Sequence, residues 1–360
     1  MMSQRPYDLI IYGAYGYTGR LITEVCKAKN IRVLISGRSE DKLKILSQSS
    51  GYPYIPADIN DAAGLISVLS QAVAVLHCAG PFSLTSRQMV EACLDTFTHY
   101  LDITGEHEVF TFLHGLDSKA KSSGIMIMPG TGFDVVPTDC AGAYLKNALP
   151  GATQLRLAFA MVPTGVSRGT ARTAFMSFGK ESLVRVDGAL KSVGPEPVVT
   201  EIDFGSKKLK SVCISWGDIV TAYHTTGIPN IEVFMASSPG LLKSIRMALK
   251  FRWFFRIGFI RRILIKAIDR RPPGPSENVL QNGRSLIYGK ATDASGKTAE
   301  VRIETSNGYR LTADMSVLIA EKVIKRNFKP GFQTPASCYG PDLIMELPNS
   351  RRIESGGIKA

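Results

Sequence analysis

Three glycines follow a short apolar run near the start of the chain with the spacing G-x-x-G-x-x-G. The run, residues 9–12, is typical of a strand, and a helical pattern begins directly after the turn. A strand that ends in this way places backbone N–H groups and a helix N-terminus where a pyrophosphate can bind. Tyr15 stands where the dinucleotide fingerprint has its second glycine, so the turn is a variant. We expect dinucleotide contacts from Gly13, Tyr15, Gly16, Tyr17, Thr18 and Gly19.

The next predicted strand, residues 31–36, ends in Gly37-Arg38-Ser39. An NAD-selective fold places an acid about 20 residues after the glycine turn, where it binds the ribose 2′-hydroxyl. Here Arg38 holds that position, and a guanidinium suits a phosphate better than a hydroxyl. The alternative is that Arg38 is a solvated loop residue. Ser39 adds a hydroxyl donor and also suits the N-cap of the following helix. We therefore predict NADP(H) as the cofactor.

Two further strand ends complete the predicted cofactor site. Asp58 and Ile59 follow the third strand and are placed to edge the adenine. Cys78, Ala79, Gly80 and Pro81 follow the fourth strand, where small residues let a backbone approach the nicotinamide ribose. Ligands of open parallel sheets bind at these carboxyl ends of the strands.

A catalytic residue is not identified from the sequence. Asp102, Glu106 and Asp134 follow the fifth and sixth strands, where a substrate would meet the cofactor, and Tyr223 lies further along the chain. We take these four as pocket candidates. The alternative for each carboxylate is a helix N-cap or a turn. The Tyr-x-x-x-Lys pair of short-chain dehydrogenases is absent, and hydride transfer itself needs mostly positioning.

The composition bounds the class of protein. The chain has 360 residues, a net charge of +12 and six cysteines without a C-x-x-C pair. Scattered cysteines favour reduced thiols, so we expect a cytoplasmic protein, with peripheral membrane attachment as an option. No metal-binding signature is present, since Glu106-His107-Glu108 lacks a second histidine one helical turn later.

The pattern of elements predicts an α/β fold: a Rossmann-type doubly wound parallel sheet plus a second α+β sheet domain. Alternating strands and helices fill residues 1–136, which we assign to an NADP-binding Rossmann domain. Residues 137–330 form the expected α+β domain for substrate binding and dimerisation. A homodimer is one option for the assembly of the protein. Residues 331–360 make a C-terminal segment.

Most of the positive charge lies in residues 240–271, which hold ten lysines and arginines against one acid, Asp269. Residues 241–268 mix these cations with bulky apolar clusters, and their charge-free runs are far below the ~18 residues of a spanning helix. The pattern favours an interfacial segment on a membrane or lipid surface. The alternative is a helical pair packed on the second domain. No recognised nucleic-acid motif accompanies the charge, so we expect no nucleic-acid partner.

Taken together, the motifs resemble saccharopine-dehydrogenase-like oxidoreductases, in particular the branch called trans-acting enoyl reductases. The resemblance covers nearly the whole chain and rests on segments 13–19, 37–38, 79–82, 100–106, 132–139 and 331–337. It implies a Rossmann domain with a second sheet domain, NADPH use, and a C-terminal segment that returns to the Rossmann domain. The enoyl reductases of this branch resemble partner enzymes that reduce double bonds in lipid chains. Family members in animals resemble proteins that associate with lipid droplets.

These observations predict an NADPH-dependent oxidoreductase that reduces an activated C=C bond of a lipid-like or acyl substrate. One alternative is a saccharopine-type amino-acid or imine dehydrogenase, for which Arg168 and Arg172 would be candidate carboxylate-binding residues. The other alternative is a lipid-surface-associated protein that binds NADP(H) without turnover.

Overall fold

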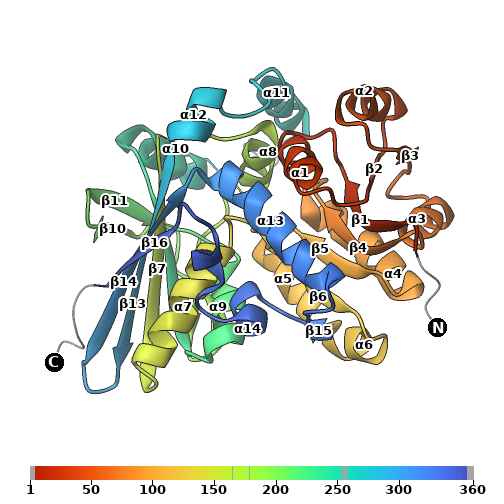
Figure 1. Ribbon diagram of the computed structural model, residues 1–360. Helices are drawn as coiled ribbons and strands as arrows, with labels where there is room; N and C mark the ends of the chain where they lie inside the picture. The colour runs from red at the N-terminus through yellow and green to blue at the C-terminus, as the bar shows by residue number, and fades with distance from the viewer. Residues whose placement is uncertain (1–4, 164, 178, 252, 254–257, 355–360) are drawn as a thin grey trace. The chain divides into compact units, whose positions relative to one another are not determined.

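The computed structural model describes residues 5–163, 165–177, 179–251, 253 and 258–354. Its contacts divide the chain into two compact units. Unit 1 comprises Met1–Val136 with Gly308–Cys338, and unit 2 comprises Pro137–Asn307 with Tyr339–Ala360. Each unit is built around one sheet, labelled in Figure 1.

The sheet of unit 1 is parallel throughout and has the strand order β15-β6-β5-β4-β1-β2-β3. Six of its strands follow the Rossmann order 3-2-1-4-5-6, and β15 extends the edge beside β6. The central strands are apolar and buried on both faces, as expected where helices cover both sides of a sheet. The strands are β1 (Tyr7–Tyr12), β2 (Val33–Gly37), β3 (Tyr54–Pro56), β4 (Ala72–His77), β5 (His99–Asp102), β6 (Met126–Met128) and β15 (Gly331–Phe332).

Helices cover both faces of this sheet (Figure 1). On one face α1 packs against α2 and α13, and on the other α3 packs against α4. The helices are α1 (Tyr17–Ala28), α2 (Glu40–Ser50), α3 (Ala62–Leu69), α4 (Ser86–Thr96), α5 (His107–His114), α6 (Asp117–Ser122), α13 (Gly308–Ile324) and α14 (Pro335–Tyr339), with the 3-10 turn η1 (Phe82–Leu84).

Unit 2 contains a mixed sheet with the main strand order β10-β11-β12-β7-β13-β14-β16, to which β8 and β9 attach beside β12. Its β12–β7 pair is parallel, and the other pairs along the main order are antiparallel. The strands are β7 (Ala152–Val162), β8 (Leu183–Val186), β9 (Ala189–Ser192), β10 (Val199–Asp203), β11 (Lys208–Cys213), β12 (Asn230–Ala236), β13 (Arg284–Asp293), β14 (Thr298–Ser306) and β16 (Arg351–Glu354).

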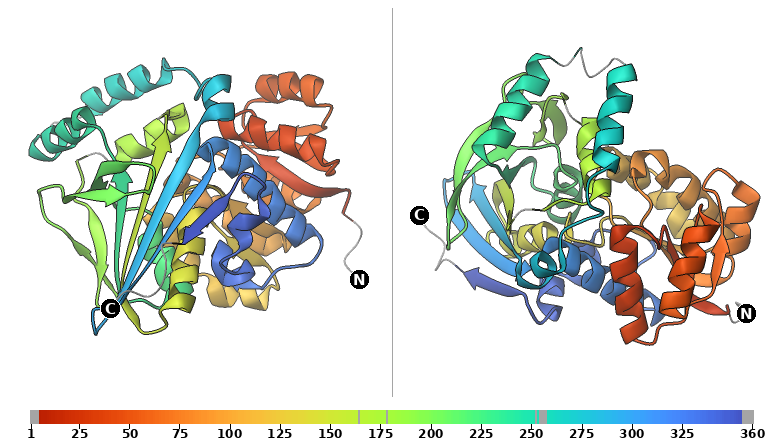
Figure 2. Two further views of the ribbon diagram at one scale, coloured as in Figure 1. Left: turned by 60° about the vertical axis from the view of Figure 1, so that its left-hand side comes forward. Right: turned by 90° about the horizontal axis from the view of Figure 1, so that it is seen from above.

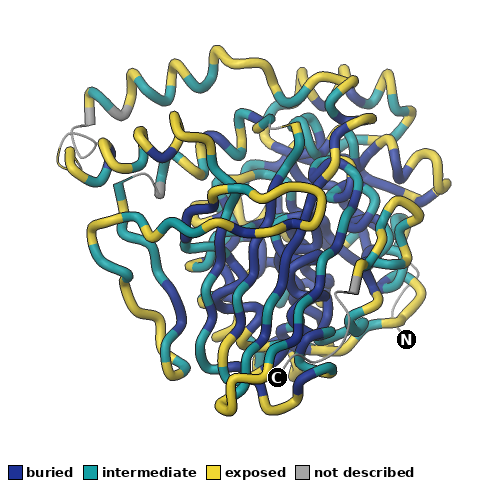
Figure 3. Tube along the Cα trace, turned by 90° about the vertical axis from the view of Figure 1, so that its left-hand side faces the viewer, coloured by how far each residue is buried: buried dark blue, intermediate teal, exposed yellow. Residues whose placement is uncertain are grey.

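The two faces of this sheet are covered differently. Gly289 of β13 faces Leu145 and Ala141 of α7, while the neighbouring residues Leu286 and Tyr288 belong to an apolar cluster on the opposite face. Figure 3 shows the buried centre of the strands. The helices of unit 2 are α7 (Val136–Ala148), α8 (Arg168–Ser177), α9 (Asp218–Thr226), α10 (Pro239–Lys250), α11 (Gly258–Asp269) and α12 (Glu277–Asn282), with the 3-10 turn η3 (Leu343–Glu346).

Helices α10 and α11 contain most of the basic, apolar segment, and they run to and from the same outer end of unit 2 (Figure 2). Residues 252 and 254–257 of that segment lie outside the described residues. Among the helices that the structure describes, none is long and apolar enough to cross a bilayer.

The fold class predicted from the sequence is confirmed, but two parts of the predicted domain division are wrong. Helix α13 belongs to unit 1, where it packs on α1, although residues 137–330 were assigned to the second domain. The C-terminal segment is split: β15 joins the first sheet, whereas residues from Tyr339 onward, with β16, belong to unit 2. An apolar stripe predicts that a helix will be buried but does not specify the sheet against which it packs.

Candidate cofactor-binding site

The glycine turn joins β1 to α1 with the geometry of an anion-binding site. Gly13 has φ +80°, and its N–H donates to the carbonyl of Ser36 at 2.8 Å. Gly16 is the N-cap of α1 and has no side chain that could accept from the N–H groups of the first helical turn. A Cβ on Gly19 would lie 2.6 Å from the carbonyl oxygen of Gly13, so only glycine lets the helix approach this closely. The turn fits a pyrophosphate.

Tyr15, the departure from the usual fingerprint, reaches across to the end of β2. Its ring lies against Gly37, where a Cβ would come within 2.8 Å of the ring edge. Its hydroxyl accepts a hydrogen bond from the N–H of Ser39 at 3.3 Å, and the ammonium of Lys42 lies 5.6 Å from the ring centroid. Tyr15 therefore holds the loop that carries Arg38. Sequence reasoning noticed the tyrosine but not this role.

Arg38 is exposed, and its guanidinium makes no hydrogen bond or ion pair with a described residue. Ser39 is the N-cap of α2, as its sequence position indicated, yet its hydroxyl makes no capping hydrogen bond. A guanidinium and a hydroxyl thus stand beside an uncapped helix N-terminus at the end of β2. This set of donors suits a 2′-phosphate.

Asp58 has a local partner. Its carboxylate accepts hydrogen bonds from the backbone N–H of Asn60 at 2.9 Å and from the Asn60 amide at 3.1 Å. These hydrogen bonds form a local turn, which is the alternative role predicted for a carboxylate at a strand end. The same loop is tied to β1, because the hydroxyl of Tyr12 donates to the carbonyl of Ala57 at 3.0 Å. Contacts from Asp58 and Ile59 to an adenine stay predictions.

The loop after β4 lies directly against the glycine turn. The N–H of Cys78 donates to the carbonyl of Tyr12 at 2.8 Å. A Cβ on Gly13 would meet the Cβ and backbone nitrogen of Ala79 at 2.9 Å. The structure therefore brings together two predicted groups of cofactor residues, the glycine turn and Cys78 to Pro81.

A hydroxyl–imidazole pair fixes this loop. The Thr85 hydroxyl lies 2.9 Å from the carbonyl of Ala79, 3.2 Å from that of Pro81 and 2.9 Å from Nε2 of His77. A hydroxyl carries one proton and both carbonyls only accept, so Nε2 of His77 must be the protonated nitrogen, donating to Thr85. Complete burial lowers the pKa of His77 to about 3, which keeps the ring neutral.

Glu106 binds the same loop from its other side through its carboxylate. One carboxylate oxygen accepts from the N–H of Phe82 at 2.8 Å, and the other accepts from the N–H of Ser83 at 3.0 Å. The N–H of Glu106 itself donates to the Thr104 hydroxyl at 3.0 Å. Glu106 thus positions the loop after β4, and its carboxylate does not cap the helix that follows it. A role of Glu106 in a substrate pocket stays a prediction.

Asp102 extends the network to β6. The buried carboxylate accepts from the N–H groups of Thr104 and Gly130, each at 2.9 Å, and from the Tyr100 hydroxyl at 2.6 Å. Burial raises the pKa of Asp102 to about 6 despite these hydrogen bonds. Asp102 therefore joins the loops at the ends of β5 and β6.

Asp134, the third carboxylate of this unit, lies on the loop after β6. Burial raises its pKa to about 7, and the negative charge of Glu106 adds to the effect. An aspartate in an unfolded chain titrates near ~3.9. Between these pH values the folded chain holds a proton that the unfolded chain releases, so this group lowers the stability as the pH rises.

Replacing Asp134 with asparagine should remove that penalty. We expect Asp134→Asn to raise the free energy of unfolding by roughly 1 to 3 kcal/mol at about pH 8 and to change it little at about pH 4. Urea unfolding at both pH values measures the difference. Asp293→Asn is the control, because local hydrogen bonds hold the pKa of Asp293 low and that variant should not gain stability at high pH. A gain of equal size at both pH values would contradict the assignment.

Tyr223, the fourth pocket candidate, belongs to α9 of unit 2. Its ring faces the guanidinium of Arg185 at 4.2 Å from the centroid, and its hydroxyl lies close to Gly188. Asp102, Glu106 and Asp134 lie together in unit 1, while the described contacts of Tyr223 are within unit 2. A catalytic role for Tyr223 stays a prediction.

The arginines considered for carboxylate binding are already paired. Arg172 makes a bidentate ion pair with Asp269 of α11, at 2.6 and 2.8 Å, and Arg168 donates to the carbonyl of Asp269 at 3.2 Å. Both residues therefore attach α8 to α11. Across the described residues no group of three or more histidine, cysteine or acidic side chains could hold a metal ion.

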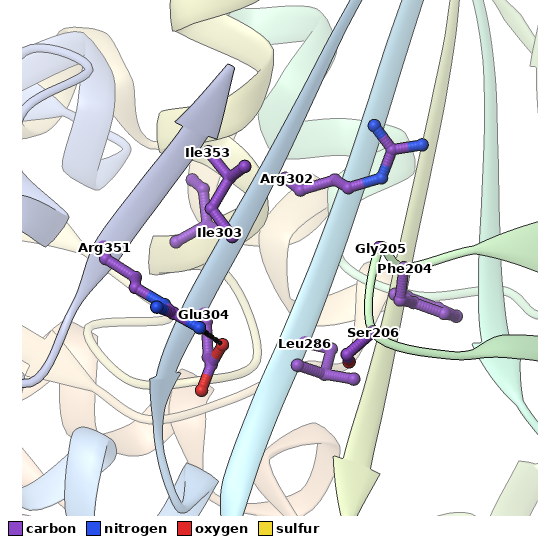
Figure 4. Close-up of a pocket in the computed structure, with 9 residues that line it drawn as sticks. All are labelled: Phe204, Gly205, Ser206, Leu286, Arg302, Ile303, Glu304, Arg351 and Ile353. Carbon is purple, nitrogen blue, oxygen red and sulfur yellow. Dashed lines mark hydrogen bonds and ion pairs between the residues drawn. The ribbon is translucent and has the colours of Figure 1, made fainter. Parts of the chain in front are cut away.

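Unit 2 contains a cavity of about 240 Å³ over strands β13, β14 and β16 (Figure 4). Phe204, Leu286, Ile303 and Ile353 supply apolar walls, but its two arginines have partners. Arg351 pairs with Glu304 at 2.6 Å, and Arg302 donates to the carbonyl of Asp203 at 2.9 Å. The predicted cofactor residues do not line this cavity.

The parallel strand order, the glycine turn and the adjacent loop define a Rossmann-type dinucleotide-binding protein with a second, mixed-sheet unit. Residues 9–128 match the family described as "Saccharopine dehydrogenase NADP binding domain". Residues 9–128 are therefore similar to the NADP-binding domain of saccharopine dehydrogenases, and the predicted resemblance to saccharopine-dehydrogenase-like oxidoreductases is confirmed. The prediction of a nicotinamide cofactor is confirmed with it.

Known proteins extend this comparison. The chain is 29% identical over 221 residues to "Saccharopine dehydrogenase-like oxidoreductase" of Mus musculus, covering 54% of this chain and 52% of the relative. It is 27% identical over 212 residues to "Lipid droplet localized protein" of Caenorhabditis elegans, covering 54% and 50%. It is 31% identical over 146 residues to "Trans-acting enoyl reductase" of Mycobacterium leprae, covering 38% and 34%. The chain thus spans about half the length of the first curated relatives it matches.

Among solved structures, apo saccharopine dehydrogenase (L-Glu forming) from Saccharomyces cerevisiae superimposes with a TM-score of 0.65. The match covers 96% of this chain and all of that one at 12% identity. This likeness shows the fold, including the second sheet unit.

Proposed function

We propose that the protein is an NADPH-dependent oxidoreductase that reduces an activated C=C bond of a lipid-like or acyl substrate. The observation that carries the cofactor part is Arg38. Its exposed guanidinium stands at the end of β2, beside the uncapped N-terminus of α2, and has no ionic partner among the described residues. A 2′-phosphate would supply that partner, whereas a bare ribose hydroxyl would leave the charge without one.

The chain's own residues build the reacting end of the cofactor site. When bound, NADPH would supply the hydride. Glu106 and the His77–Thr85 pair hold the loop after β4 in a single conformation from both sides. Asp102 joins this arrangement to the loop after β6, on which Asp134 lies. A rigid loop is what hydride transfer requires, because the reaction depends on the distance between the two carbons.

The substrate part of the proposal is supported by two relatives, one named as an enoyl reductase and one named for a lipid droplet. A second observation weakens the saccharopine-type alternative. That activity needs cations free to bind the carboxylates of an amino acid, and Arg168 and Arg172 are committed to Asp269. A lipid-like substrate does not require them.

The test is consumption of NADPH by the purified chain with α,β-unsaturated acyl thioesters of short, medium and long chain. We expect turnover that needs the double bond, so the saturated thioester of each length is the matched control. Turnover with an imine formed from an amino acid and an oxo acid, without turnover of any thioester, would establish the saccharopine-type alternative. Tight NADPH binding without turnover of either class would favour the non-catalytic lipid-surface protein.

A further inference from the structure

Helices α10 and α11 expose large apolar side chains to an unusual degree. Six of the fifteen exposed large hydrophobic residues in the described part of the chain lie between positions 241 and 263. They are Leu241, Met247, Phe251, Trp253, Phe259 and Ile263. Scattered single exposures are normal on a protein surface, but a local cluster marks an interaction site.

The outer side of α11 has an ordered pattern. Phe259 is 69% exposed and Ile263, one turn later, is 50% exposed. Arg262 and Lys266 are also exposed and follow at helical spacing, which places them on the same side, and the exposed Arg270 comes directly after the last residue of the helix. This side of the helix thus presents two bulky apolar residues with two cations, and a third cation follows at its C-terminal end.

The inner side of α11 is attached to unit 2. Ile260, Leu264 and Ile268 are partly buried there. Asp269, the one acid among residues 240–271, forms its bidentate ion pair with Arg172 of α8. The acid that could neutralise the outer side is therefore turned toward the protein. Arg262, Lys266 and Arg270 make no ion pair with a described residue.

Helix α10 repeats the arrangement. Leu242 and Ala248 are buried against the rest of unit 2, and the opposite side exposes Lys243 and Lys250 beside Met247, which is 48% exposed. The two helices end and begin at the same outer edge of the unit (Figure 2). We call these exposed residues the basic–apolar surface: Lys243, Met247 and Lys250 of α10, Phe259, Arg262, Ile263 and Lys266 of α11, and Arg270 directly after α11.

We propose that the basic–apolar surface docks the protein on an anionic lipid surface. Cations without acidic neighbours complement anionic headgroups, and Phe259 and Ile263 reach the acyl boundary between them. A nucleic-acid backbone offers no counterpart for the apolar pair. Helices of this length and charge lie in the interface without crossing it. Docking would bring a lipid-like substrate to the enzyme, and this consequence rests on the proposed function, whereas the binding itself does not.

The test is flotation of the full chain with vesicles of phosphatidylcholine alone and with vesicles that also contain phosphatidylglycerol. We expect binding to the anionic vesicles only, weakened by salt. Phe259→Asp with Ile263→Asp should weaken it by about 100-fold or more, because the loss of each apolar side chain weakens binding by roughly 10-fold or more. Arg262→Glu, Lys266→Glu and Arg270→Glu together should weaken it by about 100-fold or more.

Matched controls change the same residue types elsewhere. Ile45→Asp alters an isoleucine of α2 that is 60% exposed, and Lys207→Glu with Lys208→Glu reverses two exposed lysines of unit 2. These variants should float like the parent chain. NADPH titration of every variant shows whether it is folded and separates this inference from the proposed function. Equal binding to neutral and anionic vesicles, or unchanged flotation of the α11 variants, would overturn it. Loss of a dimer in those variants without loss of flotation would identify a contact between copies.

Discussion

Gly13→Ala is expected to abolish measurable binding of both NADPH and NADH, with a loss of at least ~100-fold in affinity. At φ +80° an alanine is strained by roughly 1 to 2 kcal/mol. Its Cβ would also lie 2.9 Å from the Cβ and backbone nitrogen of Ala79, so the turn and the loop after β4 must separate. Because both segments contact the cofactor in our assignment, either displacement weakens binding. Fluorescence titration with each dinucleotide measures the effect.

Gly51→Ala provides a matched control for the backbone strain. Gly51 has φ +81°, almost the same as Gly13, but a Cβ there would meet no atom within 4 Å. We expect Gly51→Ala to lose ~1 kcal/mol of stability and to bind both dinucleotides normally. Gly13→Ala should lose more stability, since the clash adds to the strain. If the two variants bind NADPH equally well, the glycine turn does not form the pyrophosphate site.

The parts of the site that lie within one short stretch of sequence could be predicted. The order strand, glycine turn, helix is a local property of residues 9–28, because the apolar run, the turn residues and the helical spacing are contiguous. The position of Arg38 follows from the same counting. The structure places both where the pattern indicated, with Gly13 adjoining the end of β2.

The parts that depend on contacts between loops could not be predicted. Glu106 holds Phe82 and Ser83 across a separation of 24 and 23 residues, and nothing in the spacing indicates that its carboxylate meets two backbone N–H groups. One feature does indicate that these two loops lie close together, because β4 and β5 are consecutive parallel strands with adjacent carboxyl ends. Tyr15 is similar, because its partner Ser39 depends on how the ring crosses the end of β2. Side-chain direction of this kind is a tertiary property.

Arg38→Ala is expected to remove a preference for NADPH over NADH. A charge-assisted interaction of a guanidinium with a phosphate contributes about 1.5 to 3 kcal/mol, so NADPH affinity should fall by roughly 10- to 150-fold. NADH lacks the 2′-phosphate, and its affinity should change by less than ~3-fold. Because Arg38 is exposed and has no ionic partner among the residues that the structure describes, the variant should keep the stability of the parent chain, which thermal unfolding checks.

Two further variants make this measurement specific to the guanidinium. Arg38→Lys retains the charge but loses the planar fork, so it should recover part of the NADPH affinity without the full preference. Lys44→Ala removes an exposed cation from α2 and should leave both affinities unchanged, because general attraction of a phosphate by positive charge is not the mechanism proposed. Equal loss of NADPH and NADH in Arg38→Ala would show that the residue shapes the loop held by Tyr15 and does not read the phosphate. If Arg38→Ala loses affinity for NADPH alone and Arg38→Lys recovers part of it, then Arg38 selects the phosphorylated dinucleotide. It would do so from the strand end at which NAD-selective folds have an acid.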